Sequence, residues 1–290
     1  MSIDSRDVVT RTNEKIRKER KRYFKRRALV VAIVVVVFVV IVSFVSHRPG
    51  VQIATVTVLG TETLSVSDIE KVVHARIDGK YAYLFPRNTI FFLNKSRLER
   101  DIVTAYPRVE TIDISIENRE LLVLLSEREA SYLWCGAEPF LEMVGETPCY
   151  YFDKSGFIFD SAPYFSAAVY FTLYDGLGVE LGTEPTGQYV AHKDTIESLL
   201  SFVASLESLD IRGFALALDG NQATLYLGNT KDTDAPRVLW NVDDDYSILG
   251  SNLQSALRVE PMKSEVFDTA RKLDYIDLRY SDKVYYKLKD

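Results

Sequence analysis

The hydrophobic pattern of the chain changes abruptly within its first 45 residues. Residues 1–27 are polar and basic, whereas the eighteen residues Ala28–Val45 contain no charge, proline or glycine. A helix of that length covers roughly 27 Å, about the hydrocarbon thickness of a bilayer. A buried soluble helix and a cleaved signal peptide are the alternatives. The first is seldom apolar on all sides, and the second would place Phe44 where a small residue is wanted before the cleavage site. The pattern predicts an uncleaved membrane anchor at residues 28–45.

Residues 51–129 carry a strand, two amphipathic helices and then two strands. Residues 51–59 are rich in β-branched side chains. Two serines followed three residues later by glutamate, at Ser67 and Ser96, have the spacing of a capping box and predict helix starts. Isoleucines at 112, 114 and 116 alternate with polar residues, which is typical of a half-buried strand, and residues 121–125 are its expected hairpin partner. The inward helix positions are expected to be Ile69, Val72, Val73 and Ile77, then Leu98, Ile102 and Ala105.

Residues 130–290 are predicted to form a mostly antiparallel, β-rich domain with one or two helices, so the fold class is α+β. Residues 150–159 and 213–227 each indicate a hairpin, with Asp153–Gly156 and Asp219–Asn221 as turns. An exposed helix is expected where Ile196, Leu199, Leu200, Val203 and Leu206 recur at helical spacing. A further helix is expected over residues 251–257 or 263–271. Residues 275–280 and 283–289 are the last two predicted strands.

The charge distribution indicates the orientation of the anchor. Residues 1–27 hold eleven Lys/Arg and four acids, a net charge of +7, and the rest of the chain carries −13. The Lys/Arg excess keeps the N-terminus in the cytoplasm, which predicts a single-pass type II protein of the cell membrane. A basic cluster is also compatible with nucleic-acid binding. Next to a span, topology control and attraction to anionic lipid explain it, so we expect lipid contact and no nucleic-acid partner.

Two cysteines, Cys135 and Cys149, lie in the expected outer portion, and each is next to an aromatic residue. Disulfides persist outside the cytoplasm. The position of the pair at the ends of two neighbouring strands favours a bridge over two buried free thiols. Neither cysteine has a second Cys or His at ligand spacing, so no metal site is expected there.

Catalytic motifs are absent from the sequence. It contains no nucleophile elbow, Ser-x-x-Lys, His-Glu-x-x-His or Walker-type loop, and His47, His74 and His192 are far apart. The adjacent acids Asp243–Asp245 could hold a cation, but such a run usually faces water. We therefore predict a protein that is not an enzyme, with no cofactor, no metal and no small-molecule substrate.

Several short motifs resemble the FtsQ/DivIB family of bacterial cell-division proteins. Ile53, Val56, Val58 and Gly60 match the family's "I..V.V.G" opening. Later landmarks are residues 107–109, Glu127-Arg128, the hairpin with Asp153 and Gly156, and residues 275–280, which match "iDLRy". Glu120 and Ala130 depart from the pattern, since the family often has proline there. The resemblance implies a POTRA domain at 51–129, a β-rich domain at 130–290, and a role in divisome assembly at the septum.

The last predicted strand is the candidate partner-binding site. Val284, Tyr286 and Leu288 alternate with Tyr285, Lys287 and Lys289, so one face can pack inward while an open edge accepts another chain's strand. The alternative is a strand inside the sheet that simply closes it. The resemblance implies docking of FtsB/FtsL-like membrane proteins here. The candidate residues are Tyr280, Lys283, Val284, Tyr285, Tyr286 and Lys287.

The predicted function is a noncatalytic scaffold that recruits partner membrane proteins during division. A POTRA-type chaperone or transport accessory of the envelope is the first alternative, although such proteins usually carry several POTRA repeats or a barrel. A membrane-tethered envelope enzyme is the second, and it would need a pocket that the sequence does not indicate.

Overall fold

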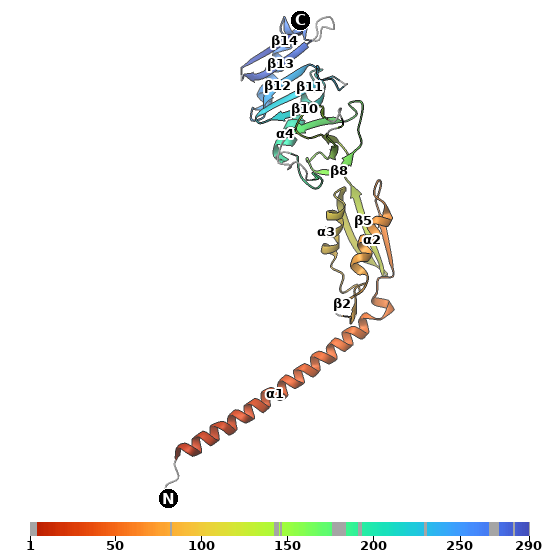
Figure 1. Ribbon diagram of the computed structural model, residues 1–290, viewed down its shortest axis with the longest axis vertical. Helices are drawn as coiled ribbons and strands as arrows, with labels where there is room; N and C mark the ends of the chain where they lie inside the picture. Colours follow the sequence, from red (N-terminus) through yellow and green to blue (C-terminus); the bar gives the residue numbers. More distant parts are fainter. Residues whose placement is uncertain are drawn as a thin grey trace. The chain divides into compact units, whose positions relative to one another are not determined.

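A computed structural model provides the structure (Figure 1). It describes residues 5–81, 83–141, 145, 147–175, 184–190, 193–228, 231–266, 273–280 and 282–289. The protein is mixed α/β, with a long N-terminal helix and a large sheet. It divides into two compact units, which are residues 1–100 with 112–125 and residues 101–111 with 126–290.

The N-terminal helix α1 runs from Ser5 to Ser46, so it includes most of the basic segment as well as the predicted anchor. Its part from Tyr23 to Ser46 is long and apolar enough to cross a membrane, and that stretch is not buried within the protein. The helix ends shortly before Pro49 and Gly50, which open the short 3₁₀ turn Pro49–Val51. Proline cannot continue a helix because it lacks the N–H donor and its ring clashes with the preceding turn.

Residues 55–127 contain the predicted order of strand, helix, helix, strand and strand; most of them belong to the first unit, and residues 101–111 and 126–127 belong to the second. The elements are β1 (Thr55–Leu59), α2 (Val66–Ile77), α3 (Lys95–Ala105), β4 (Val109–Glu117) and β5 (Glu120–Glu127), with a small hairpin, β2 (Lys80–Tyr81) and β3 (Phe85–Pro86), between the helices. The sheet order is β1-β5-β4, and β1 is parallel to β5. Of the predicted inward residues, Ala105 is exposed and Val72 is half-buried. Ile69, Val73, Ile77, Leu98 and Ile102 are buried.

Both predicted helix starts are wrong by two residues. Helix α2 has Ser65 as its N-cap, and Ser67 lies in the first turn, where its hydroxyl shares a 2.8 Å hydrogen bond with that of Ser65. Before helix α3, Asn94 Oδ1 accepts the backbone N–H of Arg97 at 3.0 Å, so Ser96 is not the cap. Ser and Asn are comparably good caps, so spacing alone does not choose between neighbouring candidates.

Gly60 closes strand β1 for a steric reason. Its φ is +90°, and a Cβ built there would lie 1.9 Å from the carbonyl oxygen of Leu125. A side chain at this position therefore meets both an unfavourable backbone conformation and a backbone atom that cannot move aside. The glycine in the "I..V.V.G" pattern thus has a packing role.

The second unit is built on a nine-stranded mixed sheet in the order β14-β13-β12-β11-β10-β9-β6-β7-β8. Five neighbouring pairs are antiparallel and three are parallel, so the prediction of a mostly antiparallel sheet is confirmed, with three parallel pairs within it. The strands are β6 (Tyr132–Trp134), β7 (Cys149–Phe152), β8 (Ile158–Ala162), β9 (Phe171–Asp175), β10 (Gly213–Asp219), β11 (Gln222–Leu227), β12 (Arg237–Asn241), β13 (Leu273–Tyr280) and β14 (Lys283–Leu288).

Two parallel pairs arise from helical crossovers. Helix α4 (Lys193–Glu207) connects β9 to its parallel neighbour β10. Helices α5 (Tyr246–Ala256) and α6 (Met262–Glu265) connect β12 to its parallel neighbour β13. The described part of residues 130–290 therefore has three helices, where one or two were predicted. Helix α5 begins before the expected 251–257, and α6 overlaps the start of 263–271, of which residues 267–271 lie outside the described residues.

Helix α4 is not the exposed helix that its sequence predicted. Ile196, Leu199, Val203 and Leu206 are buried in the main core. In that core the ring of Phe202 contacts Trp240 of β12 edge-to-face, with centroids 5.2 Å apart. The helical crossovers cover one face of the sheet because these apolar stripes need a partner surface.

The opposite face has a smaller core of aromatic residues. Phe140, in the loop between β6 and β7, places its ring 5.5 Å from Tyr174 and 5.1 Å from Tyr226. The cluster also includes Leu133, Cys135, Cys149, Phe214, Ala215 and Ala235. The covered part of this face thus lies over the middle of the sheet, next to the cysteine pair.

Candidate partner-binding site

The C-terminal strand β14 forms one edge of the large sheet. It pairs with β13 in an antiparallel ladder that includes Ile276 opposite Tyr286 and Asp277 opposite Tyr285. Its other side pairs with no strand in the described part of the chain, and Figure 1 shows β14 at the end of the strand series β10–β14. Of the two sequence interpretations, the structure therefore has the edge strand and not the closing one. The unpaired N–H and C=O groups of such an edge can accept a further strand.

The inner face of β14 is attached to the core. Val284, Tyr286 and Leu288 are half-buried and pack against the main core. The Tyr286 hydroxyl donates a 2.6 Å hydrogen bond to Glu265 Oε2 on α6. The strand is thus held in place from one side, so a partner would meet a preformed edge.

The outer face of the same hairpin presents two exposed tyrosines. Tyr280 is 54% exposed and Tyr285 is 48% exposed. Their rings lie edge-to-face with centroids 5.1 Å apart. The exposed Lys283 and Lys287 lie on the same face, and Lys287 Nζ is 3.4 Å from Asp274 Oδ2. This arrangement offers aromatic area and positive charge next to an open backbone edge.

An ion pair within β13 supports this surface. Asp277 accepts from Arg279 Nε at 2.9 Å and from Nη2 at 2.6 Å, and Arg279 Nη1 donates to Gln222 Oε1 on β11 at 2.8 Å. Because the arginine donates to it, the pKa of Asp277 lies below its usual value, although burial acts in the opposite direction. The Asp and Arg of the "iDLRy" motif therefore connect strands across the sheet, and Tyr280 remains available for contact.

The opposite edge strand, β8, is partly covered. The backbone N–H of Ile158 donates to Gln188 O, and the N–H of Gly187 donates to Ile158 O, each at 2.8 Å. A chain segment thus already occupies the start of this edge. β14 is the more accessible of the two sheet edges for adding a strand.

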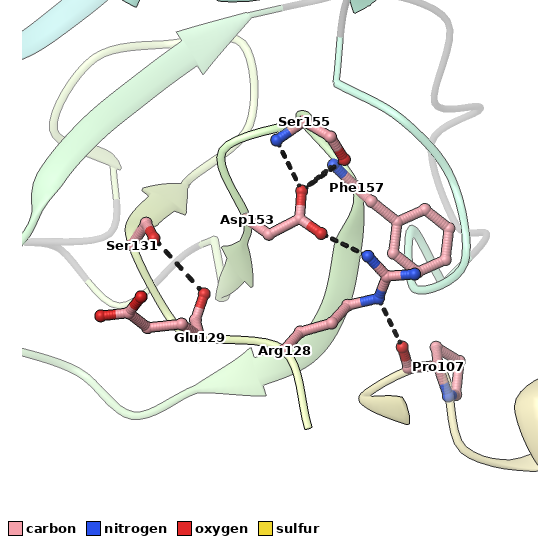
Figure 2. A network of polar contacts seen from close by, with 7 residues as sticks. All are labelled: Pro107, Arg128, Glu129, Ser131, Asp153, Ser155 and Phe157. Atoms are coloured by element: carbon pink, nitrogen blue, oxygen red, sulfur yellow. Dashed lines mark hydrogen bonds and ion pairs between the residues drawn. The ribbon is translucent and has the colours of Figure 1, made fainter. Parts of the chain in front are cut away.

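A second group of polar residues lies at the turn between β7 and β8 (Figure 2). Asp153 Oδ1 accepts from the backbone N–H groups of Ser155 and Phe157, at 2.8 and 3.2 Å, and from the Ser155 hydroxyl. Its Oδ2 accepts from Arg128 Nη1 at 2.5 Å, and Arg128 Nε donates to Pro107 O at 3.1 Å. The guanidinium also lies 4.3 Å from the centroid of the Phe157 ring.

The Arg128–Asp153 pair has the properties of a structural site. Both side chains are mostly buried, at 17% and 13% exposure. Burial alone raises the pKa of Asp153, but the hydrogen bonds from Ser155, Phe157 and Arg128 outweigh it, so the pKa lies below its ordinary value. Both carboxylate oxygens already have donors, which leaves this group poorly suited to act as a base.

A second arginine of the same unit makes a similar contact. Arg108 donates to Asp160 Oδ2 on β8 from Nε and Nη2, at 2.9 and 2.7 Å. Its backbone carbonyl accepts the N–H of Arg128 at 2.8 Å. The landmarks at 107–109 and 127–128 thus converge on the β7–β8 hairpin.

The two cysteines lie at disulfide distance, with their sulfurs 2.00 Å apart, and both are buried. They lie at the ends of the paired strands β6 and β7, where the sequence placed them. The bond encloses the loop that carries Phe140 and so holds this ring against Tyr174 and Tyr226.

Replacing both cysteines with serine is expected to lower the free energy of unfolding of the second unit by about 3 kcal/mol, because a closed loop of this length restricts the unfolded chain. Both tryptophans of the chain, Trp134 and Trp240, lie in this unit and are buried. Tryptophan fluorescence during denaturant unfolding therefore reports on it selectively. Thiol labelling of unreduced, denatured wild-type protein at Cys135 and Cys149 would contradict the bridge.

The acidic run Asp243–Asp245 serves local structure. Asp245 is the N-cap of α5 and accepts from the backbone N–H of Ser247 at 2.9 Å. Asp244 accepts from the Asn241 side chain at 3.1 Å. Across the part of the chain that the structure describes, no group of three or more His, Cys, Asp or Glu side chains is positioned to hold a metal ion.

Comparison with models of known protein families gives no match, and comparison with curated proteins gives none.

All six predicted site residues come together on the β13–β14 hairpin, with Tyr280, Lys283, Tyr285 and Lys287 outward and Val284 and Tyr286 inward. Sequence reasoning missed two supports of this hairpin, Glu265 and Asp274. Glu265 lies on a four-residue helix that periodicity cannot detect, and Asp274 interrupts the alternation at a shift in register. Gln222, the partner of Arg279, is 57 residues away in sequence.

Proposed function

We propose that this chain is a noncatalytic, single-pass membrane scaffold of bacterial cell division, of the FtsQ/DivIB type. Its N-terminus lies in the cytoplasm, and both folded units lie outside. It recruits FtsB/FtsL-like membrane proteins at the division septum through the β13–β14 edge. Residues 51–129 serve as a POTRA domain next to the bilayer, and residues 130–290 as the β-rich partner-binding domain.

The observation that carries the proposal is the open edge of β14. Its inner face packs on the core and its outer face presents Tyr280 and Tyr285. A partner strand added there gains main-chain hydrogen bonds, and the tyrosine pair and the two lysines select the partner's side chains. Anchoring in the membrane plane raises the effective concentration of the edge near other membrane proteins.

The order of elements in residues 55–127 agrees with this assignment. A strand, two helices and two strands follow directly after a helix that is long and apolar enough to span a membrane. The connection between that helix and β1 is short, from His47 to Ala54. The first unit is therefore expected to stay close to the bilayer surface.

Cellular position tests the biological role. A fluorescently tagged full-length chain, imaged in the bacterium that makes it, is expected to form a band at midcell during constriction. Uniform signal around the envelope would contradict a division role and favour an envelope chaperone or transport accessory instead.

Proline substitution in β14 tests the edge itself. Successive N–H groups of a strand point to opposite sides, so one of Val284→Pro and Tyr285→Pro removes an outward donor and the other a donor to β13. The outward variant is expected to keep the stability of the second unit and to lose partner capture. Val284→Ala and Tyr285→Ala control for the lost side chains. Retention of full capture by both folded proline variants would exclude strand addition at β14.

A further inference from the structure

An aromatic loop in the first unit exposes apolar side chains that its fold does not use. The loop, residues 83–92, follows β2 and includes β3. Tyr83 is 94% exposed, Phe91 is 68% exposed and Leu84 is 49% exposed. Beneath them, Phe92 contacts the rings of Tyr81 and Phe85 at centroid distances of 6.4 and 5.6 Å. The loop is therefore shaped by its own ring packing, while three large side chains remain outside that packing.

The tip of this loop has an unusual backbone conformation. Tyr83 has a φ of 62°, a region that few non-glycine residues adopt. Such a conformation persists only where the surroundings impose it, and it often marks a functional position. Here it lies at the most exposed aromatic residue of the loop.

Hydrogen bonds place the loop beside the end of helix α1. Ser43 Oγ donates to the carbonyl oxygen of Leu84 at 3.0 Å. Leu84 also lines an apolar groove with Val36, Val40 and Phe44 of the helix. Ser43 lies three residues before the helix ends at Ser46, which is about 4.5 Å along the axis. The backbone of the loop therefore reaches the depth of the last apolar turn.

A second set of hydrogen bonds fixes the other end of the loop. The N–H of Ile90 donates to Val51 O at 3.0 Å, and the N–H of Ile53 donates to Asn88 O at 2.7 Å. Val51 belongs to the short connection that follows the helix. Phe91 is thus held next to the exit of the chain from the helix.

The charge around the loop matches a lipid surface. Residues 47–53 and 79–95 contain Arg48, Lys80, Arg87 and Lys95 and no Asp or Glu. The guanidinium of Arg48 lies 4.5 Å from the Phe44 ring centroid, and that of Arg87 lies 5.0 Å from that of Tyr81. Aromatic rings combined with long basic side chains are typical of the membrane–water interface, and cations there attract anionic headgroups.

We infer that residues 83–92 are a second membrane contact, in which Tyr83, Leu84 and Phe91 insert into the interface between lipid headgroups and acyl chains. This contact rests on the proposed spanning role of α1. It gives the first unit two attachments to the bilayer, which restricts its rotation about the anchor. The occupant of this apolar surface is lipid, because Leu84 shares an apolar groove with the helix and the adjoining segments 47–53 and 79–95 carry four cations and no acid.

Site-specific fluorescence in vesicles tests the inference. The full-length variant Tyr83→Cys is labelled with NBD without reductant and reconstituted into vesicles of phosphatidylethanolamine and phosphatidylglycerol. Spin-labelled lipid with the nitroxide near the top of the acyl chain serves as quencher. Leu124→Cys is the matched control, since Leu124 is 50% exposed in the same unit and pairs with Leu59, the last residue of β1. Background labelling of Cys135 and Cys149 by NBD is measured on the wild type.

The label at position 83 is expected to show blue-shifted emission and strong quenching. The label at position 124 is expected to show the emission of NBD in water and little quenching. Equal emission and quenching at the two positions would overturn the loop contact. A third variant, Val36→Cys, separates this failure from that of the anchor. If the label at position 36 is quenched and that at 83 is not, only the loop inference fails. If the label at 36 also remains in water, the spanning role and the loop contact fail together.

Discussion

Replacing Tyr285 with alanine is expected to weaken capture of the proposed FtsB/FtsL-like partner about 30-fold, because an aromatic anchor of an interface contributes about 2 kcal/mol or more. Tyr285 is half-exposed, and its ring is supported by Tyr280 at a centroid distance of 5.1 Å. The pair thus presents a large contact area that loses little conformational entropy on binding. The affinity is measured with the full-length chain in lipid nanodiscs and the extracytoplasmic segment of the partner.

The structure offers a matched control for this substitution. Tyr189 belongs to the same unit and is 47% exposed, against 48% for Tyr285. Tyr189→Ala is expected to leave the affinity unchanged. The double variant Tyr280→Ala/Tyr285→Ala should lose less than the sum of the two single losses, because the rings contact each other. Similar affinities for the Tyr189 and Tyr285 variants would contradict the assignment of this surface.

Breaking the Arg128–Asp153 pair is expected to destabilise the second unit strongly. Arg128→Met removes the counterion of a mostly buried carboxylate, which should lower the free energy of unfolding of the second unit by about 2–4 kcal/mol. Asp153→Asn should act in the same direction, because it removes the charge that Arg128, Ser155 and Phe157 stabilise. Tryptophan fluorescence follows the loss, since Trp134 and Trp240 lie in the same unit.

The effect of Asp153→Asn depends on pH in a defined direction. The folded-state pKa of Asp153 lies below its unfolded value of 3.8. Its contribution to stability is therefore fully present above the unfolded pKa and is lost as the pH falls through the folded pKa. The difference in unfolding free energy between wild type and Asp153→Asn should be constant near neutral pH and shrink below about pH 4.

Two controls accompany these variants. Lys287→Ala breaks a more exposed ion pair of the same unit, with the side chains of Lys287 and Asp274 53% and 23% exposed, and should change stability little. The double variant Arg128→Met/Asp153→Asn should cost less than the two single losses combined, because each single change leaves the other partner unpaired. Additive losses would mean that the two residues do not act as a pair.

Local periodicity predicted most elements of the fold but not which elements lie side by side in the folded protein. The alternation of Val284, Tyr286 and Leu288 identified the inward face of the last strand. Whether β14 lies at an edge depends on the order of nine strands, and that order depends on two helical crossovers. Helix α4 shows the same limit, because its apolar stripe was recognised while the sheet that buries it is formed by distant strands.

The polar contacts between residues far apart in the chain could not be predicted from the sequence for a similar reason. Arg108 and Asp160 are 52 residues apart, and Arg128 and Asp153 are 25 apart. Each residue alone has the appearance of an ordinary surface charge. Arg108 and Arg128 lie within the motif positions 107–109 and 127–128, but only the fold shows that they contact the β7–β8 hairpin.

Hydrogen exchange at β14 tests the central proposal most directly. The full-length chain in nanodiscs is exchanged with and without the extracytoplasmic segment of the proposed FtsB-like partner. Strand addition predicts that about half of the amides of residues 283–288, those that point outward, become protected on binding. Binding that leaves exchange of this peptide unchanged, with protection appearing elsewhere on the chain, would contradict the proposal.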